Sequence, residues 1–148
     1  MGRDRNNMHT FNISMKSIYF YSLVGIILWP LFASAQLVVT VLPVKTTGQK
    51  AVVQLKLKNN FTNAVQSARA ACFLLDDQGN MIGQSSEWVI GQNKTSLEPK
   101  GETTFNFVIT SSQPFSTTNL TAKVSFSRVV LDGGKLADAA KDVRIDPK

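Results

Sequence analysis

Apolar and polar residues alternate with a period of two along most of the chain after residue 36. This period places successive side chains on opposite faces of a strand, as in half-buried antiparallel sheets. Strands are therefore predicted over 37–42, 53–58, 68–75, 81–90, 103–110, 120–127 and 143–145. About seven short strands joined by Gly, Asn, Asp and Pro predict an all-β, immunoglobulin- or fibronectin III-like antiparallel two-sheet sandwich. A small β-barrel is the alternative, because alternation alone does not separate the two architectures.

The residues between these segments favour turns. Residues 76–80, DDQGN, predict a tight connection in which Asp side chains accept from the turn's own amides and Gly79 takes a positive φ. A calcium loop is the alternative for these aspartates, but Gly79 interrupts the series of oxygen ligands that such a loop needs. Gly83 predicts a bulge in its strand, and 132–134 predicts a hairpin turn. Residues 136–140 have helical propensity ahead of the closing strand.

The strand over 68–75 is apolar on both faces, so its inward face has to be inferred. Phe73 and Leu75 share one face and are expected to be core anchors. The opposite face forms an apolar partner surface if nothing covers it, and coverage by loops or by a terminal strand is the alternative. The candidate partner surface comprises Leu74, Cys72, Trp88 and Phe115.

Cys72 is the only Cys in the chain, so no disulfide can form within one copy. Its apolar surroundings predict a buried, inert thiol. A disulfide between two copies is the alternative in an oxidising compartment.

The edge strands of a sandwich have backbone groups that can pair with a strand of another chain. The predicted edges are 37–42 and 81–90. The interior of the first segment carries no charge, so nothing there opposes such pairing. We therefore expect self-association or capture of a partner strand at this edge, unless it lies inside the sheet.

An apolar run near the amino terminus predicts an export signal. Lys16 supplies a positive charge ahead of the apolar residues 18–32, and Ala33 and Ala35 fit the small-x-small pattern that signal peptidase recognises. Cleavage after Ala35 would make Gln36 the mature amino terminus. An uncleaved signal anchor is the alternative, because the apolar run approaches the ~17–25 residues that span a bilayer.

The signal divides the chain into a presequence, 1–35, and a single predicted β-sandwich domain, 36–148. Translation is expected to start at Met15, because the residues before it are polar and fit poorly ahead of a signal. The protein is therefore expected to be exported, either to the periplasm or to the medium. Membrane attachment through 18–35 follows only if the signal is not cleaved.

The composition of the predicted domain excludes several kinds of chemistry. His9 is the only His and lies in the presequence, so neither a His-based catalytic triad nor a His-based zinc site can form in the domain. One Cys cannot build a multi-thiolate metal centre, and there is no Gly-rich phosphate loop. No catalytic, cofactor-binding or metal-binding residues are therefore expected, and the domain is predicted not to be an enzyme.

The charge of the chain does not favour a nucleic-acid partner. The formal net charge of +6 falls to +4 without the presequence, because three basic residues and one acidic residue lie before residue 36. Lys56 and Lys58 alternate with leucines and are expected on the solvent face of a strand. No run of Lys and Arg is interleaved with aromatic residues, so nucleic-acid binding is not expected.

Residues 73–77, FLLDD, resemble the motif of the FxLYD domain, a small immunoglobulin-like module of exported bacterial proteins. Phe, Leu and the final Asp match, and the fourth residue is Asp where the family has Tyr. Residues 77–82 resemble the hairpin of this family. Residues 97–102 followed by Phe105 resemble its Leu-x-Pro-Gly-Glu…Phe entry into the next strand, with one additional Lys. The resemblance spans 51–130 and implies an exported immunoglobulin-like fold, with no common catalytic residues to carry over.

Together these observations predict an exported, non-enzymatic β-sandwich that binds a protein or another component of the cell envelope, without a cofactor. A small secreted proteinase inhibitor is an alternative from a different class. In it, residues 113–116 would form the presented loop, which Pro114 would stiffen while Phe115 filled a specificity pocket of the proteinase. The alternative for Phe115 is that its side chain packs back onto the core.

Overall fold

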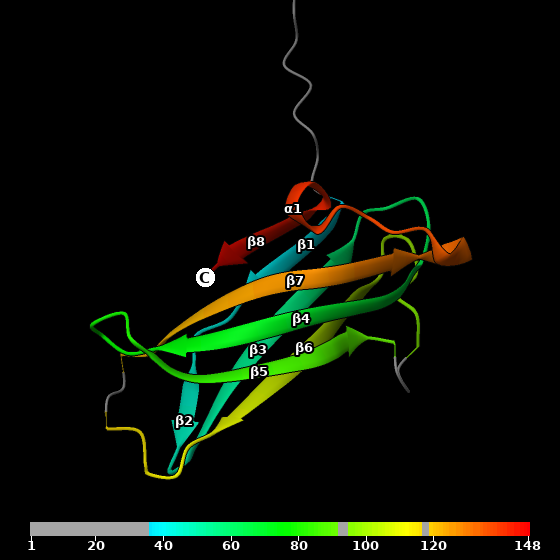
Figure 1. Ribbon diagram of the computed structural model, residues 1–148. Helices are drawn as coiled ribbons and strands as arrows, with labels where there is room; N and C mark the ends of the chain where they lie inside the picture. The colour runs from blue at the N-terminus through cyan, green and yellow to red at the C-terminus, as the bar shows by residue number, and fades with distance from the viewer. Residues whose placement is uncertain (1–35, 92–94, 117–118) are drawn as a thin grey trace, which may run out of the picture. The chain divides into compact units, whose positions relative to one another are not determined.

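The computed structural model describes residues 36–91, 95–116 and 119–148. Within these ranges the chain is almost entirely β-structure (Figure 1). The elements are β1 (Leu37–Val41), β2 (Lys45–Thr47), β3 (Lys50–Asn59), β4 (Val65–Leu75), β5 (Met81–Ile90), β6 (Glu102–Thr110), β7 (Thr121–Leu131), the 3-10 turn η1 (Asp132–Gly134), α1 (Ala139–Asp142) and β8 (Val143–Pro147).

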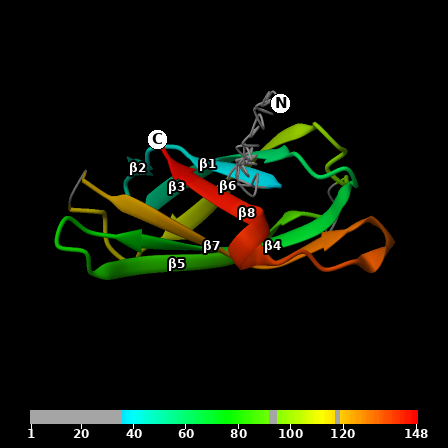
Figure 2. The same cartoon turned by 90° about the horizontal axis from the view of Figure 1, so that it is seen from above.

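The strands form two sheets that pack face to face, and the predicted all-β sandwich is confirmed. In one sheet β3 pairs with β1 and β2 along different parts of its length and with β6, and β1 also pairs with β8. The second sheet has the order β5-β4-β7. Figure 2 shows the two layers one above the other. The pairing is antiparallel throughout except between β1 and β8, which run parallel.

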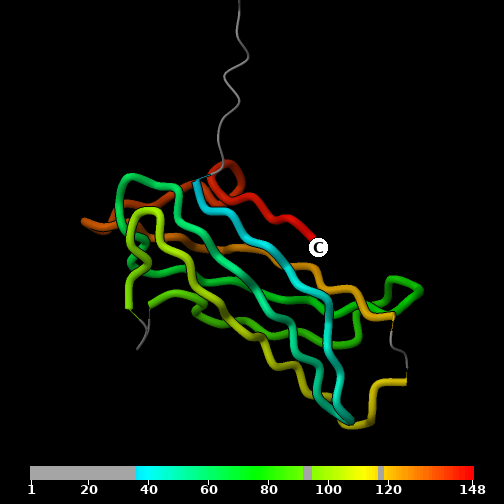
Figure 3. Tube along the Cα trace, turned by 180° about the vertical axis from the view of Figure 1, so that it is seen from behind, coloured from blue at the N-terminus to red at the C-terminus, as the bar shows by residue number. Residues whose placement is uncertain are grey.

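The prediction that 37–42 forms an edge strand is wrong. β1 lies between β3 and β8 in its sheet (Figure 3). It pairs with β8 from Leu37 opposite Val143 to Val41 opposite Pro147. Self-association through this strand is therefore excluded in the folded domain, because β8 occupies the edge that β1 would have offered.

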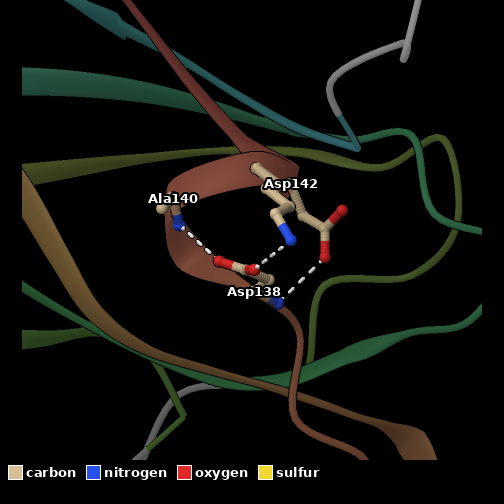
Figure 4. Close-up of polar contacts among 4 residues, drawn as sticks. Asp138, Ala140 and Asp142 are labelled. Atoms are coloured by element: carbon tan, nitrogen blue, oxygen red, sulfur yellow. Dashed lines mark hydrogen bonds and ion pairs between the residues drawn. The ribbon is translucent and has the colours of Figure 1, made fainter.

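The short helix α1 positions β8 beside the start of β1. Asp138 caps the helix: its carboxylate accepts the Ala140 N–H at 3.0 Å, and the Asp142 carboxylate accepts the Asp138 N–H at 2.9 Å (Figure 4). Lys141 lies 3.4 Å from the Asp138 carboxylate. The pKa of Asp138 is lowered, chiefly because its carboxylate accepts the Ala140 N–H. The Gln36 N–H donates to the Asp142 carbonyl at 3.0 Å, which joins both ends of the described chain.

The core lies between the sheets, and β4 contributes the face opposite to the one predicted. Ala70, Cys72 and Leu74 are fully buried, whereas Phe73 and Leu75 are only half-buried on the outer face. The register explains this outcome, since cross-strand neighbours share a face: Cys72 pairs with Val124 of β7, and Phe73 pairs with the exposed Lys123. The expectation that Phe73 and Leu75 anchor the core is therefore wrong.

The bulge predicted in β5 is confirmed, and it allows the sheets to approach closely. Leu74 pairs with Gly83 and Leu75 with Met81, which leaves Ile82 as the extra residue. A Cβ atom on Gly83 would lie 2.6 Å from Cγ2 of Ile109 in β6. The absence of a side chain at this position thus sets how near β5 lies to β6.

Asn59 is the one buried polar residue of the described core. Its side-chain amide donates to the carbonyls of Asn63 and Leu97 at 3.0 and 2.8 Å, and its side-chain oxygen accepts the Phe61 N–H at 2.8 Å. These bonds connect the end of β3 to the loop before β4 and to the segment around Leu97, which itself forms a bridge with Val65. Asn59 therefore satisfies backbone groups that would otherwise be buried without partners.

Candidate binding face and edge strand

The outer face of the three-stranded sheet has a row of partly exposed apolar side chains. Phe73 and Leu75 of β4 are half-buried there because their side chains point away from the core. Trp88 of β5 is also half-buried and lies opposite Arg69 in the ladder. The Arg69 guanidinium carbon lies 5.9 Å from the centre of the Trp88 ring, within the range of a cation–π contact. This row gives the face the aromatic and Arg composition that is enriched in protein interfaces.

β5 is one of the two edge strands of this sheet, as predicted for 81–90. Its first two residues are exposed although they are apolar, with Met81 at 58% and Ile82 at 38% of their maximal surface. Glu87 is the only charged residue among its ten. β5 therefore combines an open backbone edge with exposed apolar side chains and little charge to oppose pairing.

A hollow of about 410 Å³ opens beside the start of β5. Its lining includes Asp76 and Asp77 of the turn, Ile82 of β5, and Phe115 from the loop after β6. The Asp76 carboxylate accepts N–H bonds from Gln78 and Asn80, at 3.0 and 2.8 Å, and an amide bond from the Asn80 side chain at 3.1 Å. The bonds from Asn80 are the main cause of a lowered pKa for Asp76.

These bonds show that Asp76 organises the turn between β4 and β5, as the turn prediction required. Both oxygens of the Asp76 carboxylate accept bonds from within the turn, Oδ1 from the Gln78 and Asn80 N–H groups and Oδ2 from the Asn80 side chain. Among the described residues, no three His, Cys, Asp or Glu side chains are grouped so that they could hold a metal ion.

Two of the predicted partner-surface residues are not on the surface. Cys72 and Leu74 are fully buried between the sheets, so this part of the prediction is wrong. Burial raises the pKa of the Cys72 thiol to about 11, which keeps the thiol protonated and inert. Of the predicted set, Trp88 lies on the outer face, and Phe115 is half-buried at the hollow.

Phe115 packs against the hydrophobic core from the loop after β6. Its N–H donates to the Gly48 carbonyl at 3.2 Å, which ties this loop to the turn between β2 and β3. A side chain held against the core is poorly placed to enter the specificity pocket of a proteinase, so no observation favours the inhibitor alternative.

The cleavage residues Ala33 and Ala35 lie outside the described residues, and Gln36 is the first residue inside them. None of the helices in the described part of the chain has the length and apolar character that crossing a bilayer requires.

Sequence reasoning missed the outer-face row and the exposed start of β5. The row could have been recognised from the pairing of Phe73 with Lys123, but this pairing depends on the register between strands far apart in the sequence. The exposure of Met81 and Ile82 follows from their place at an edge beside a bulge, and neither residue type indicates that on its own.

No protein-family model matches the chain, and no curated protein matches it. Solved structures with a similar course of the chain include the X-ray structure of the Northeast Structural Genomics Consortium target SoR45. It is 10% identical with a TM-score of 0.46, over 70% of this chain and 80% of that one. A Bordetella pertussis protein given the name ApaA is 13% identical with a TM-score of 0.45, over 66% of this chain and 88% of that one.

Proposed function

We propose that this protein is an exported, non-enzymatic β-sandwich module that binds a partner protein through β5 and the adjoining outer face. The observation that carries this proposal is the partly apolar edge at β5, where Met81 and Ile82 are exposed and Glu87 is the only charged residue. Edge strands of this kind add a strand from another chain, with backbone bonds supplying affinity and neighbouring side chains supplying selectivity. The Trp88–Arg69 pair lies on the same face and supplies such side chains.

Export is part of this proposal, and it rests on the signal-like residues 15–36 and on the resemblance to FxLYD modules. We expect amino-terminal sequencing of the protein from its native host to begin at Gln36. A protein recovered from the cytosol that begins at Met15 or earlier would overturn the exported part of the proposal. An intact amino terminus in the membrane fraction would support the signal anchor instead.

The binding part can be tested with a photo-crosslinking amino acid placed on either side of Phe73. Gln84 of β5 and Lys123 of β7 both pair with Phe73, and both are exposed. A crosslinker at either position therefore reports on one of the two edges of the sheet, at the same distance along the strands. We expect the Gln84 position in the full chain, expressed in its native host, to give one or a few discrete protein adducts, and the Lys123 position to give none of them.

The same adducts from both positions would place the contact elsewhere than at β5. Adducts from neither position, with the variant folded by circular dichroism, would contradict the proposed binding function. Mass spectrometry of a discrete adduct identifies the partner directly.

A further inference from the structure

Two arginines lie opposite each other on the outer face of the three-stranded sheet, in which β4 runs between β5 and β7 (Figure 1). Arg69 of β4 pairs with Arg128 of β7, and both residues are exposed. Like charges directly opposite each other on neighbouring strands destabilise a sheet. None of the ion pairs among the described residues involves either arginine. Their mutual repulsion is therefore not offset within the described part of the chain.

A bulge in β7 brings this arrangement about. Ser127 is the extra residue opposite Arg69, so that Ser127 and Arg128 are both exposed between the buried Phe126 and Val129. The Ser127 hydroxyl donates to the Arg69 carbonyl at 3.4 Å. A second bulge, in β5, lies beside Arg69 on its other side. Bulges redirect side chains and are frequent next to functional sites, and here they flank the pair of arginines.

Trp88 of β5 restrains one member of the pair. It lies opposite Arg69 in the ladder, and the guanidinium carbon of Arg69 is 5.9 Å from the centre of its ring. This cation–π contact limits the freedom of the Arg69 side chain, which lowers the entropy lost when a ligand orders it. Neither the Arg69 nor the Arg128 guanidinium donates a hydrogen bond to another described residue. Their N–H groups are therefore available to a ligand.

The surrounding face is positive. The three strands contain three basic residues, Arg69, Arg128 and Lys123, and one acidic residue, Glu87. Lys123 lies on the same outer face as the two arginines. Glu87 pairs with Ala70, which is buried between the sheets, so the alternation of β5 directs Glu87 to the other side of the ladder. A partner that is complementary to the outer face therefore carries negative charge.

We propose that Arg69 and Arg128 form a binding site for a carboxylate of the partner protein, and that the partner's contacting segment is acidic. A guanidinium presents paired N–H donors that fit a carboxylate, and one carboxylate between the two groups offsets their repulsion. An anionic membrane fits less well, because polybasic contacts with lipids use clusters of about four to eight Lys and Arg. This inference rests on the proposed function, because it names the chemistry of the partner that binds beside β5.

The test uses a defined acidic probe, triglutamate with both ends blocked, and blocked triglutamine as its neutral counterpart. The isotope-labelled full chain, purified as the cell processes it, is titrated at an ionic strength of about 0.15 M. The NMR signal of the Trp88 indole N–H reports on the site, because Trp88 contacts Arg69. We expect saturable binding of triglutamate in the millimolar range and no binding of triglutamine.

Lys123→Gln is the matched control for Arg128→Gln, because both remove one exposed positive charge from the same strand and the same face. Lys123 pairs with Phe73, four residues along β4 from Arg69, which corresponds to about 13 Å. This separation exceeds the Debye length of about 8 Å. We expect the Kd for triglutamate to rise at least about fivefold in Arg128→Gln and to stay within about twofold in Lys123→Gln. Arg128→Lys keeps the charge but loses the planar donors, so it should also weaken binding, by at least about twofold.

Equal weakening by Arg128→Gln and Lys123→Gln would overturn the inference, because diffuse attraction would then account for the binding. The absence of a saturable shift with triglutamate would overturn it as well. Binding to phosphatidylglycerol vesicles that Arg128→Gln abolishes, with no binding of triglutamate, would overturn it and assign the two arginines to lipid headgroups.

The proposed function is judged separately, by the crosslinker at Gln84. A discrete protein adduct whose yield is unchanged in Arg128→Gln would leave the proposed function standing and overturn the inference about the acidic segment. Adducts from neither Gln84 nor Lys123 would contradict the proposed function, whatever the outcome with triglutamate.

Discussion

Replacing the buried Asn59 by Ala is expected to destabilise the domain more than replacing any single polar residue of its surface or its turns. The side chain is fully buried and makes three hydrogen bonds to backbone groups of Phe61, Asn63 and Leu97. Ala removes all three bonds at once and leaves the backbone groups where they are. The consequence depends on which of these groups has another partner.

The three groups differ in this respect. The Leu97 carbonyl keeps the Val65 N–H at 2.9 Å, so losing the Asn59 bond there costs about 0.5 kcal/mol. The Asn63 carbonyl is part-buried and can be hydrated, at a cost of about 0.5–1 kcal/mol. The Phe61 N–H is buried and loses its acceptor, which costs about 1–3 kcal/mol. The expected loss of unfolding free energy is therefore about 3 kcal/mol, taken as the middle of these ranges.

Urea unfolding followed by circular dichroism measures this difference. Asn60→Ala is the matched control, because the Asn60 N–H still donates to the Gln36 carbonyl and no side-chain hydrogen bond joins Asn60 to the described residues. We expect the control to change the unfolding free energy by less than about 0.5 kcal/mol. A loss below about 1 kcal/mol for Asn59→Ala, or equal losses for the two variants, would refute the assignment of Asn59 as the buried connection between these segments.

Three further outcomes are expected. Gly83→Ala places a Cβ atom 2.6 Å from Cγ2 of Ile109 and is expected to cost about 1–3 kcal/mol in urea unfolding. Ile109→Leu removes that methyl branch, so it should recover part of the loss in the double variant, and strictly additive effects would contradict the contact. Cys72, with its pKa raised to about 11 by burial, is expected not to react with a thiol reagent at pH 8 until the protein is unfolded in guanidinium; prompt reaction of the folded protein would show that the thiol is accessible. Because the pKa of Asp138 is lowered in the folded state, its carboxylate stabilises the fold above its unfolded pKa of about 3.9, and this contribution is lost as the pH falls through the lower folded value. The urea midpoint of Asp138→Ala should therefore lie below that of the wild type at pH 7 and approach it below about pH 4, and a constant difference would argue against the carboxylate as the cause.

Much of the strand structure was accessible from local pattern. The alternation over 103–110 and 53–58 lies within β6 and β3, because one face of each strand is apolar and the other is polar. The turn at 76–80 was predictable for the same local reason, since Asp76 accepts from amides two and four residues ahead. These interactions form between near neighbours in the sequence, so the residue types alone indicate them.

β4 shows where this reasoning stops. Ala70 to Leu75 are all apolar, so the sequence does not indicate which face is buried. The register against β7 decides it, because Lys123 must remain in solvent and Phe73 lies beside it. The candidate surface was therefore predicted with two residues, Cys72 and Leu74, that the fold buries.

The sequence by itself determined the all-β class and most strand positions, and it supplied the expectation of export. The tertiary structure alone decided which edges are open. β1 is protected because β8, about a hundred residues further on, pairs beside it, whereas β5 has no such neighbour among the described residues. The physical reason is that strand pairing uses backbone groups that every residue shares, so the choice of neighbour is set by packing between distant segments.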